Sequence, residues 1–365
     1  MGGGLLQLVA YGAQDVYLTG NPQITFFKVV YRRHTNFALE SIQQTFNGSV
    51  GFGNRVTATI SRNGDLINRA YLVLTPGADV AVPYGGLRAI QYAELEIGGQ
   101  KIDKHYGEWM YIWNELSLPK GKRDGYDTMV GKAKLTANKK HYVPLEFWFC
   151  RNVGLALPLI GLQYHEVKVN IQFETASVMA NTSTTLDAEL WVDYVYLDTD
   201  ERRKFAQSSH EYLIEQLQFT GNEAANSKIK LNFNHPVKEL VWVARRSSPT
   251  NWNDYDDSNG DNLIQTAKLT LNGNDRFAVR DGDYFNLVQP FQHHENVPSN
   301  VGINVYSFAL KPEEHQPSGT LNMSRIDTAT LDCSYGTGAD SVSIYAVNYN
   351  VLRILSGMGG IAYSN

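Results

Sequence analysis

Apolar and polar residues alternate along many short stretches of this chain, and the same order of stretches occurs twice. The clearest pair is 93–99, AELEIGG, and 267–273, AKLTLNG. In each, alternation with a period of two predicts a strand with one buried face, and the closing Gly-Gly or Asn-Gly pair predicts a tight hairpin turn. The tripeptides 107–109 (GEW) and 282–284 (GDY) follow at matching places. The chain is therefore predicted to contain one β-rich unit used twice.

Weaker correspondences keep the same order in the two halves. Each half is expected to hold a strand-turn-strand unit, an aromatic strand, a loop (with proline in the first half), an alternating run and a closing aromatic strand. No pair beyond the first is convincing alone, but their shared order favours a duplication. The matched pairs are 56–74 with 229–243, 147–149 with 308–310, 166–171 with 327–331, and 190–197 with 342–349.

Two stretches break the strand pattern. In the first, four large apolar residues follow the i, i+3, i+4, i+7 spacing of a helix, which is predicted to lie in a loop that caps one end of a sandwich. In the second, 198–204, acidic residues precede basic ones as a helix dipole favours, and this segment is expected to link the two halves. The four apolar residues of the first stretch are Trp109, Ile112, Trp113 and Leu116.

The first residues are predicted to form an arm, because flexible glycines precede a small apolar patch at 5–9, and a turn follows it. From Ile24 to Val30 the pattern becomes strand-like, and short strands separated by turns then recur to Leu197, as in an all-β sandwich. The expected division is an N-terminal arm over 1–24, a first domain over 25–206 and a second domain over 207–365.

Composition narrows the possible classes of protein. At 365 residues the chain exceeds what one hydrophobic core usually supports, and 43% apolar residues suffice for two cores. The net charge of −5 argues against a protein that coats nucleic acid. Cys150 and Cys333 fall in different halves, which suits assembly in a reducing compartment. The longest apolar run, 153–162, has about ten residues against the roughly 20 that a membrane span needs.

Motifs of catalytic chemistry are incomplete. The segment 125–132 approximates a phosphate-binding loop, but its spacing is off by one residue and Ala133 offers no hydroxyl for magnesium. The adjacent His293 and His294 would point to opposite faces of a strand, so with Glu295 they are expected to form a polar loop rather than a metal site. No catalytic residue, metal site or cofactor is expected. The lysines expected to form a solvated basic loop are Lys132, Lys134, Lys139 and Lys140.

An alternative function is suggested by the acidic segment 251–261, which is expected to be an exposed loop. Its residues Trp252 and Tyr255 offer rings on which a sugar could stack, as in a carbohydrate-binding sandwich of the lectin kind. Asn-x-Ser sequons begin at Asn47, Asn181 and Asn322, although nothing directs the chain to the glycosylation machinery.

Six long segments carry a resemblance to a known family: 12–37 (GAQDVYLTGNPQITFFKVVYRRHTNF), 48–65 (GSVGFGNRVTATISRNGD), 157–171 (LPLIGLQYHEVKVNI), 233–243 (FNHPVKELVWV), 284–294 (YFNLVQPFQHH) and 302–328 (GINVYSFALKPEEHQPSGTLNMSRIDT). They resemble the major capsid proteins of the nucleocytoplasmic large DNA viruses, especially those of algal viruses. The segments cover nearly the whole chain, and runs of this length are far more specific than a short motif.

The resemblance implies an all-β fold of two consecutive eight-stranded jelly-roll sandwiches with short helices in loops. It implies a structural protein that forms homotrimeric, pseudo-hexagonal capsomers tiling an icosahedral virion shell, assembled in the host cytoplasm. Its expected partners are itself, neighbouring capsomers, and minor capsid and penton proteins, with the arm toward an inner membrane layer and no direct nucleic acid. The proline-containing segment 311–319 is expected to form a rigid loop needed for the trimer.

Overall fold

The structure, a computed structural model, describes residues 2–179 and 185–364. It separates into two compact units, and the boundary between them falls between Asn36 and Phe37. The predicted sequon at Asn181 lies outside the described residues.

The first unit contains two short helices, α1 (Gly3–Val9) and α2 (Val16–Thr19), with the 3-10 turn η1 (Ala13–Asp15) between them. None of their residues is buried, because elements of this length cannot form a core of their own. The strand expected over 24–30 is wrong: the stretch is irregular, since no strand of the described chain pairs with it to satisfy its backbone. No helix among residues 2–179 and 185–364 is long and apolar enough to cross a membrane.

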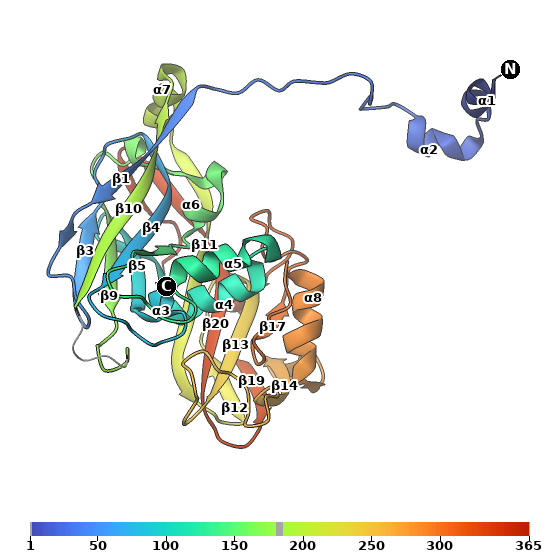
Figure 1. Cartoon of the computed structure of the whole chain (residues 1–365). Coiled ribbons are helices and arrows are strands. Elements are labelled where there is room, and N and C mark those ends of the chain that lie inside the picture. The colour runs from blue at the N-terminus through green and yellow to red at the C-terminus, as the bar shows by residue number, and fades with distance from the viewer. Residues whose placement is uncertain (1, 180–184, 365) are drawn as a thin grey trace. The chain divides into compact units, whose positions relative to one another are not determined.

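The second unit begins with a sandwich of two antiparallel sheets (Figure 1). One sheet has the strand order β1-β10-β4-β7, with the short β8 beside β4, and the other has the order β2-β3-β9-β5-β6. The bounds are β1 (Phe37–Gln44), β2 (Phe46–Asn47), β3 (Arg55–Thr59), β4 (Leu66–Pro76), β5 (Ile90–Ile97), β6 (Gln100–Tyr106), β7 (His141–Pro144), β8 (Leu157–Pro158), β9 (Val167–Phe173) and β10 (Leu186–Leu197).

A second sandwich follows in the chain. Its first sheet has the order β11-β20-β13-β17, with β18 and β21 at its margins, and its second sheet has the order β12-β19-β14-β15, with β16 beside β14. The bounds are β11 (His210–Ala224), β12 (Lys228–Leu231), β13 (Pro236–Arg246), β14 (Ile264–Leu271), β15 (Asn274–Asp275), β16 (Arg280–Asp281), β17 (Asn304–Ser307), β18 (Leu321–Asn322), β19 (Ala329–Tyr335), β20 (Ala339–Leu355) and β21 (Met358–Ile361).

The two sandwiches share one topology. If the main strands of each are numbered in chain order, without the short β2, β8, β16, β18 and β21, one sheet has the order 1-8-3-6 and the other 2-7-4-5, in both sandwiches. Pairing of the first strand with the last, and of the second with the seventh, is the wrapped arrangement of a jelly roll. The protein is therefore a double jelly roll, which confirms the fold class and the duplication predicted from the sequence.

Short helices occupy the loops of both sandwiches. The helix predicted from the apolar spacing at 109–116 forms as α4, and the helix predicted between the halves forms as α7, where the Asp198 side chain accepts a hydrogen bond from the backbone N–H of Thr199. The bounds are α3 (Gly85–Arg88), α4 (Gly107–Ser117), α5 (Lys120–Val130), α6 (Trp148–Arg151), α7 (Thr199–Gln207) and α8 (Gln289–His293). The 3-10 turns are η2 (Val153–Leu155), η3 (Leu159–Gly161) and η5 (Met323–Arg325), and η4 (Tyr284–Val288) is a short π-helix.

Both predicted hairpins are present. Gly98 and Gly99 join β5 to β6 with φ of +59° and +84°, and Asn272 and Gly273 join β14 to β15 with φ of +48° and +80°. Two positive φ angles in succession are typical of the tight turn that matches the twist of antiparallel strands, and Gly and Asn adopt them at low cost.

Gly107 and Gly282 occupy equivalent places after these hairpins. A Cβ atom at Gly107 would collide with the carbonyl oxygens of Leu87 and Ile90, and one at Gly282 with the carbonyl oxygen of Ile264. Ile90 and Ile264 are the first residues of β5 and β14. Each glycine therefore lets the chain pass close to the first residue of the equivalent strand, β5 in the first half and β14 in the second. The correspondence between the two halves thus includes this backbone contact.

Replacing Gly107 by alanine is expected to destabilise the fold by about 1–3 kcal/mol or more, because backbone oxygens cannot move aside for the added methyl group. Gly125→Ala in α5 is the matched control. Its Cβ would meet nothing within 4 Å, so the change should stabilise the helix by about 0.5–1 kcal/mol. Urea unfolding of both variants measures the difference, and equal effects would contradict the close-approach argument.

Two predicted aromatic strands are wrong. At 147–149 the chain forms the start of α6, where Phe147, Trp148 and Phe149 are all at most 2% exposed. A strand would have turned the middle ring away from its neighbours, whereas a helical turn buries all three. At 308–310 the chain leaves β17, and the N–H groups of Phe308 and Ala309 both bond to the carbonyl of Lys238.

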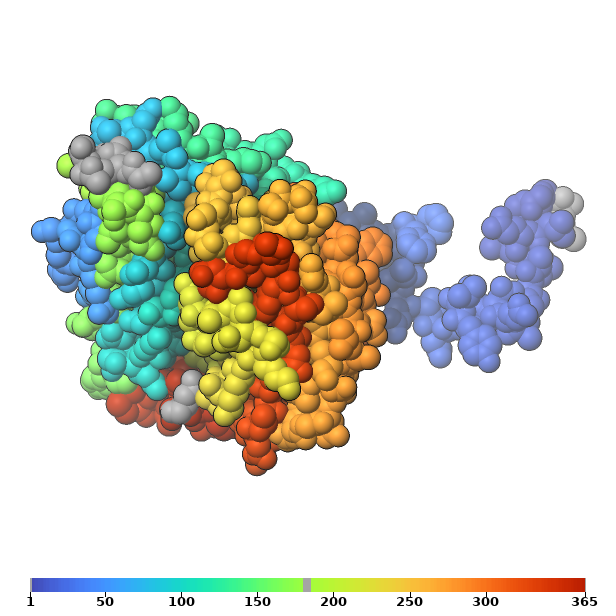
Figure 2. Space-filling model, turned by 90° about the horizontal axis from the view of Figure 1, so that it is seen from below, coloured from blue at the N-terminus to red at the C-terminus, as the bar shows by residue number. Residues whose placement is uncertain are grey.

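The sheet that contains β13 is buried on both faces. Leu240, Trp242 and Ala244 belong to the core of the second sandwich, whereas Val241 and Val243 belong to the core cluster of the first. This explains the unbroken apolar run LVWVA at 240–244, since a strand covered on both sides does not alternate. In Figure 2 the green and cyan surface of the first sandwich directly adjoins the yellow and orange surface of the second. We call the contact between the two sandwiches the seam.

Candidate assembly interface

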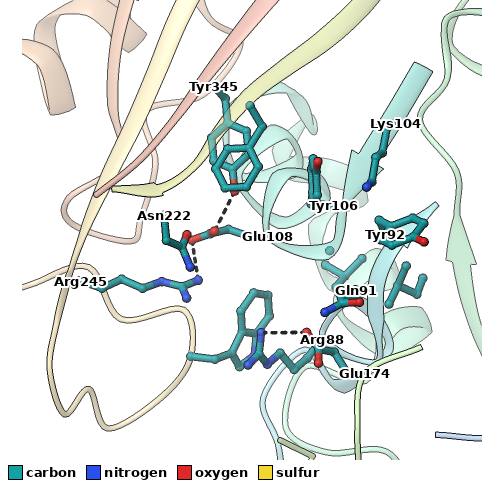
Figure 3. Close-up of a pocket in the computed structure, with 15 residues that line it drawn as sticks. Arg88, Gln91, Tyr92, Lys104, Tyr106, Glu108, Glu174, Asn222, Arg245 and Tyr345 are labelled. Atoms are coloured by element: carbon teal, nitrogen blue, oxygen red, sulfur yellow. Dashed lines mark hydrogen bonds and ion pairs between the residues drawn. The ribbon is translucent and has the colours of Figure 1, made fainter. Parts of the chain in front are cut away.

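Helix α4 lies in the seam, rather than capping one end of a sandwich as expected. The carboxylate of Glu108, in its first turn, accepts hydrogen bonds from three side chains of the second sandwich. Figure 3 shows two of them, Arg245 and Tyr345. The donors are Arg245 at 2.5 Å, the Tyr255 hydroxyl at 3.1 Å and the Tyr345 hydroxyl at 2.7 Å. One carboxylate from the first sandwich thus joins three groups of the second.

The charges at Glu108 suit this role. Burial raises the pKa of the Tyr255 and Tyr345 hydroxyls well above their ordinary value, and the negative charge of Glu108 raises it further, so both remain donors. Burial acts to lower the pKa of Arg245, but the Glu108 charge outweighs it and the net shift is upward. The two hydroxyls and the guanidinium therefore donate to Glu108 in one charge-assisted network.

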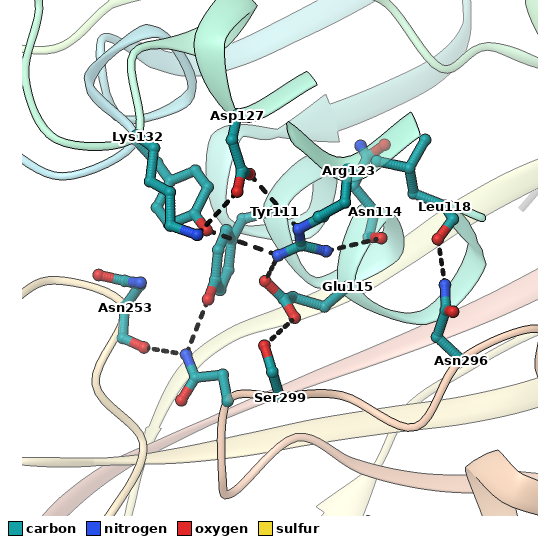
Figure 4. A network of polar contacts seen from close by, with 12 residues as sticks. Tyr111, Asn114, Glu115, Leu118, Arg123, Asp127, Lys132, Asn253, Asn296 and Ser299 are labelled. Carbon is teal, nitrogen blue, oxygen red and sulfur yellow. Dashed lines mark hydrogen bonds and ion pairs between the residues drawn. The ribbon is translucent and has the colours of Figure 1, made fainter. Parts of the chain in front are cut away.

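A second polar cluster lies at the other end of α4 (Figure 4). Glu115 pairs with Arg123 of α5 and accepts a hydrogen bond from Ser299 of the second sandwich at 3.1 Å. Arg123 also approaches Asp127 at 3.4 Å. The Tyr111 hydroxyl accepts from the Asn300 amide at 2.9 Å. Both ends of α4 are thus bonded to the second sandwich, which restricts rotation of one sandwich against the other.

The acidic loop at 251–261 is less exposed than expected. Tyr255 is fully buried, and the Trp252 ring packs edge-on against Tyr111 while its indole N–H donates to the carbonyl of Pro83 at 2.5 Å. Rings held in this way help to close the seam. Tyr255 cannot stack on a sugar, and the lectin alternative loses the residues that suggested it.

A buried ionic cluster joins the same two sandwiches at another place. Glu215 of β11 lies between Lys238 of β13 and Arg151 of α6, with a nitrogen–oxygen distance of 2.8 Å to each. The Lys238 side chain is 0% exposed and that of Glu215 is 5% exposed. Burial alone would raise the pKa of Glu215, but the charges of Arg151 and Lys238 hold it well below its ordinary value. Glu215 is therefore a buried carboxylate that stays ionised.

The two histidines that were predicted to form a polar loop, His293 and His294, have different surroundings. His293 contacts the carbonyl of Leu310 at 3.0 Å. The imidazole of His294 is fully buried between two carboxylates, Glu239 at 2.9 Å and Glu313 at 2.8 Å. Despite burial, which acts in the opposite direction, these carboxylates raise the pKa of His294 to about 9. His294 is a cation that ties α8 to β13 and to the loop 311–319, and the described residues contain no group of three or more side chains suited to a metal ion.

An exposed apolar surface adjoins this histidine. We call it the α8 patch and define it as Leu287, Val288, Phe291 and Leu310, which are 47%, 39%, 78% and 73% exposed. Leu310 lies at the start of the loop 311–319, whose base is closed by hydrogen bonds from the N–H of Leu310 to the Ser318 carbonyl and from the N–H of Lys311 to the Ser318 hydroxyl. A contiguous apolar surface of this kind is a candidate for contact with another chain.

The other sequence candidates are not brought together. Lys132, Lys134 and Lys140 pair separately with Asp127, Asp79 and Glu189, as expected for solvated lysines rather than a nucleotide site. Cys150 and Cys333 are free thiols in different sandwiches, and burial raises the pKa of both. Sequence reasoning missed Glu108, in the first turn of α4. It also missed Glu215 and Glu239, two strand residues that alternation places on solvent-facing positions.

Comparisons with known proteins identify the family. The family described as "Large eukaryotic DNA virus major capsid protein" matches residues 201–360, and that described as "Major capsid protein N-terminus" matches residues 25–198. A major capsid protein of Pyramimonas orientalis virus is 58% identical over 402 residues, and one of Paramecium bursaria Chlorella virus 1 is 47% identical over 438 residues; both alignments span 100% of each chain. The crystal structure of PBCV-1 VP54, fitted into a reconstruction of the virophage Sputnik, has a TM-score of 0.85 and 43% identity and covers 93% of this chain and 100% of that chain.

Two sandwiches of equal topology, fixed to each other along a bonded seam, make up a chain that superimposes on this capsid protein over nearly its whole length. The chain belongs to the family of major capsid proteins of large eukaryotic DNA viruses. It is a component of the capsid shell of the virion and not an enzyme.

Proposed function

We propose that the protein forms homotrimeric capsomers with a pseudo-hexagonal outline, which tile an icosahedral shell. The observation that carries this proposal is the equal topology of the two sandwiches. Three chains with two sandwiches each give six similar units around a three-fold axis. The seam supports the same proposal, because six units make a regular outline only if the two sandwiches of each chain keep a fixed relative orientation.

The α8 patch is the surface that we propose for contact between chains of a trimer. A closed three-fold ring needs contacts between two different surfaces of each chain, and such contacts bury apolar side chains at their centre. Phe291 and Leu310 are the most exposed members of the patch. The loop 311–319 beside it is held from within, because Glu313 pairs with His294.

Further partners belong to the same proposal. Neighbouring capsomers, minor capsid proteins and penton proteins would meet the outer edges of the trimer, and assembly would take place in the host cytoplasm without direct contact to nucleic acid. The arm would lie on the inner face, toward a membrane layer or a minor protein. Leu5, Leu6 and Leu8 of α1 are exposed, so the arm has apolar surface for a partner. The division into an arm over 1–24 and domains over 25–206 and 207–365 is proposed with them.

Light scattering behind a sizing column tests the trimer. The native protein is expected near three times 40.9 kDa. The double variant Phe291→Ser, Leu310→Ser should elute as a monomer with an unchanged circular dichroism spectrum, because both side chains are exposed in the single chain and their loss leaves its core intact. Point variants are preferable to deletion of 311–319, which would also remove Glu313 from His294.

Val153→Ser is the matched control, since Val153 is 69% exposed in η2 and lies outside the α8 patch. It should remain trimeric. A double variant that still forms trimers would contradict the assignment of the patch, and a native protein that remains a stable monomer at high concentration would contradict the trimer itself.

A further inference from the structure

A cavity of about 390 Å³ opens at the seam (Figure 3). Residues of α3, β5, β6 and α4 line it from the first sandwich, and residues of β11, β13, β20 and the loop 251–261 line it from the second. The volume lies in the range of sites that bind small molecules. The cavity exists only because both sandwiches contribute to it, so an occupant would contact both.

Lys104 is the first reason to expect an anion in this cavity. Its ammonium group lies 3.8 Å from the centre of the Tyr92 ring and 5.3 Å from that of Tyr106. Within the described part of the chain, no carboxylate pairs with this ammonium group and no acceptor receives a hydrogen bond from it. Burial, followed by repulsion from Lys101, lowers its pKa. A cation held on aromatic faces, with its N–H groups unused, is poorly satisfied without an anionic partner.

Arg88 and Arg245 are the second reason. The nearest carboxylate to Arg88 is Glu174, at 3.9 Å, which is beyond hydrogen-bond distance. The Nε atoms of both arginines are buried and have no hydrogen-bond partner among the described residues. The two guanidinium groups repel each other enough to lower the pKa of Arg88, for which burial is the larger cause. Arg88 therefore lines the side of the cavity formed by α3, with its nearest carboxylate beyond hydrogen-bond distance.

The charge of the lining agrees with its donors. Three cationic side chains, Arg88, Lys104 and Arg245, stand against two carboxylates, Glu108 and Glu174. Glu108 is already saturated by Arg245 and the two tyrosine hydroxyls described above. The lining therefore carries an excess positive charge with free N–H donors, in a partly enclosed space where charge-assisted hydrogen bonds are strong.

We propose that this cavity binds a small phosphate-bearing molecule that bridges the two sandwiches. A phosphate group has three oxygens directed away from one another, so it can accept from an ammonium group on one wall and guanidinium groups on another, whereas a carboxylate offers two oxygens in one plane. The rest of the molecule would lie beside Tyr106 and Phe219, which line the same cavity. Occupancy would stabilise the relative orientation of the sandwiches.

Isothermal titration of the intact protein with inorganic phosphate, adenosine monophosphate and citrate tests the proposal. Saturable binding of at least one of the two phosphate compounds is expected, with a rise in melting temperature of roughly 4 °C at saturation. Lys104→Gln should weaken this binding by about tenfold or more. Circular dichroism of the variant checks that it is folded.

Lys101→Gln is the matched control. Lys101 lies three residues earlier in β6, is 56% exposed, pairs with Glu94 and does not line the cavity. The Lys101→Gln variant should bind the phosphate compounds with an affinity within about twofold of that of the native protein. Absence of saturable binding of both phosphate compounds at millimolar concentration would overturn the proposal. So would binding of citrate alone, or an equal loss of affinity in the Lys101 and Lys104 variants.

Discussion

Replacing Glu215 by alanine is expected to destabilise the folded chain by about 3–5 kcal/mol. The carboxylate lies between Arg151 and Lys238, and Lys238 is fully buried. Removal of Glu215 would leave the Lys238 ammonium in the core without its closest counter-charge. The free-energy cost of removing this ammonium from water would then no longer be offset by an ion pair with Glu215. Urea unfolding at neutral pH, followed by circular dichroism, measures the loss. Acid should mimic it in the native protein: because the pKa of Glu215 is depressed on folding, its contribution is complete above the ordinary carboxyl pKa and is lost as the pH falls through the folded value.

Glu211→Gln is the control for this prediction. Glu211 lies on the same strand and pairs with Arg353 at 2.8 Å, but both side chains are more than half exposed. An exposed pair contributes about 0–1 kcal/mol, so the variant should unfold close to the native protein. If the Glu215 and Glu211 variants lose equal stability, Glu215 does not neutralise a buried charge.

Stability is also expected to fall in the alkaline range, between about pH 6.5 and pH 9, through His294. Its pKa rises from an ordinary 6.5 to about 9 on folding, so folding binds a proton there. The contribution, about 3 kcal/mol, is fully present below pH 6.5 and is lost as the pH rises through 9. Deprotonation would leave Glu239, on β13, and Glu313, in the loop 311–319, without the cation between them. Trp113 of α4, which faces the imidazole edge-on at 6.4 Å, offers no replacement charge.

His294→Gln should remove this dependence, lowering the unfolding midpoint at pH 6.5 and flattening the profile above it. His293→Gln is the neighbouring control, because its imidazole meets only a backbone carbonyl among the contacts described, and it should keep the native profile. Denaturant midpoints taken from pH 6 to pH 10 compare the three proteins. A His294 variant with the same alkaline slope as the native protein would show that another group causes the loss.

The strands and hairpins could be predicted because their signals are local. Alternation at 93–97 and 267–271 requires one buried face, and Gly98-Gly99 and Asn272-Gly273 require a particular turn, whatever the rest of the fold does. Because these signals recur in the same order in both halves, they predict one β-rich unit used twice. The stretch 24–30 failed because alternation suits a strand but does not provide the partner strand that a sheet needs.

The seam could not be predicted in the same way, since it depends on contacts distant in the sequence. Alternation places Glu215 and Glu239 on polar faces, yet both are buried because the sheet of β11, β20, β13 and β17 is covered on both sides. One signal was available: the unbroken run at 240–244 is typical of a strand buried on both faces, and charges beside such a run are candidates for burial. Trp252 and Tyr255 show the converse, because their polar neighbours suggested exposure while the rings themselves favour burial.

The shared core cluster has a consequence for the chain as a folding system. Val241, Val243, Val305 and Val347 of the second sandwich complete the apolar cluster of the first, so the two halves cannot be separated without exposing this shared cluster. The two jelly rolls are separate units of topology, but the shared cluster is expected to make them unfold as one cooperative system. Heat or denaturant should melt it in one transition, and damage in either half lowers the melting point of the whole.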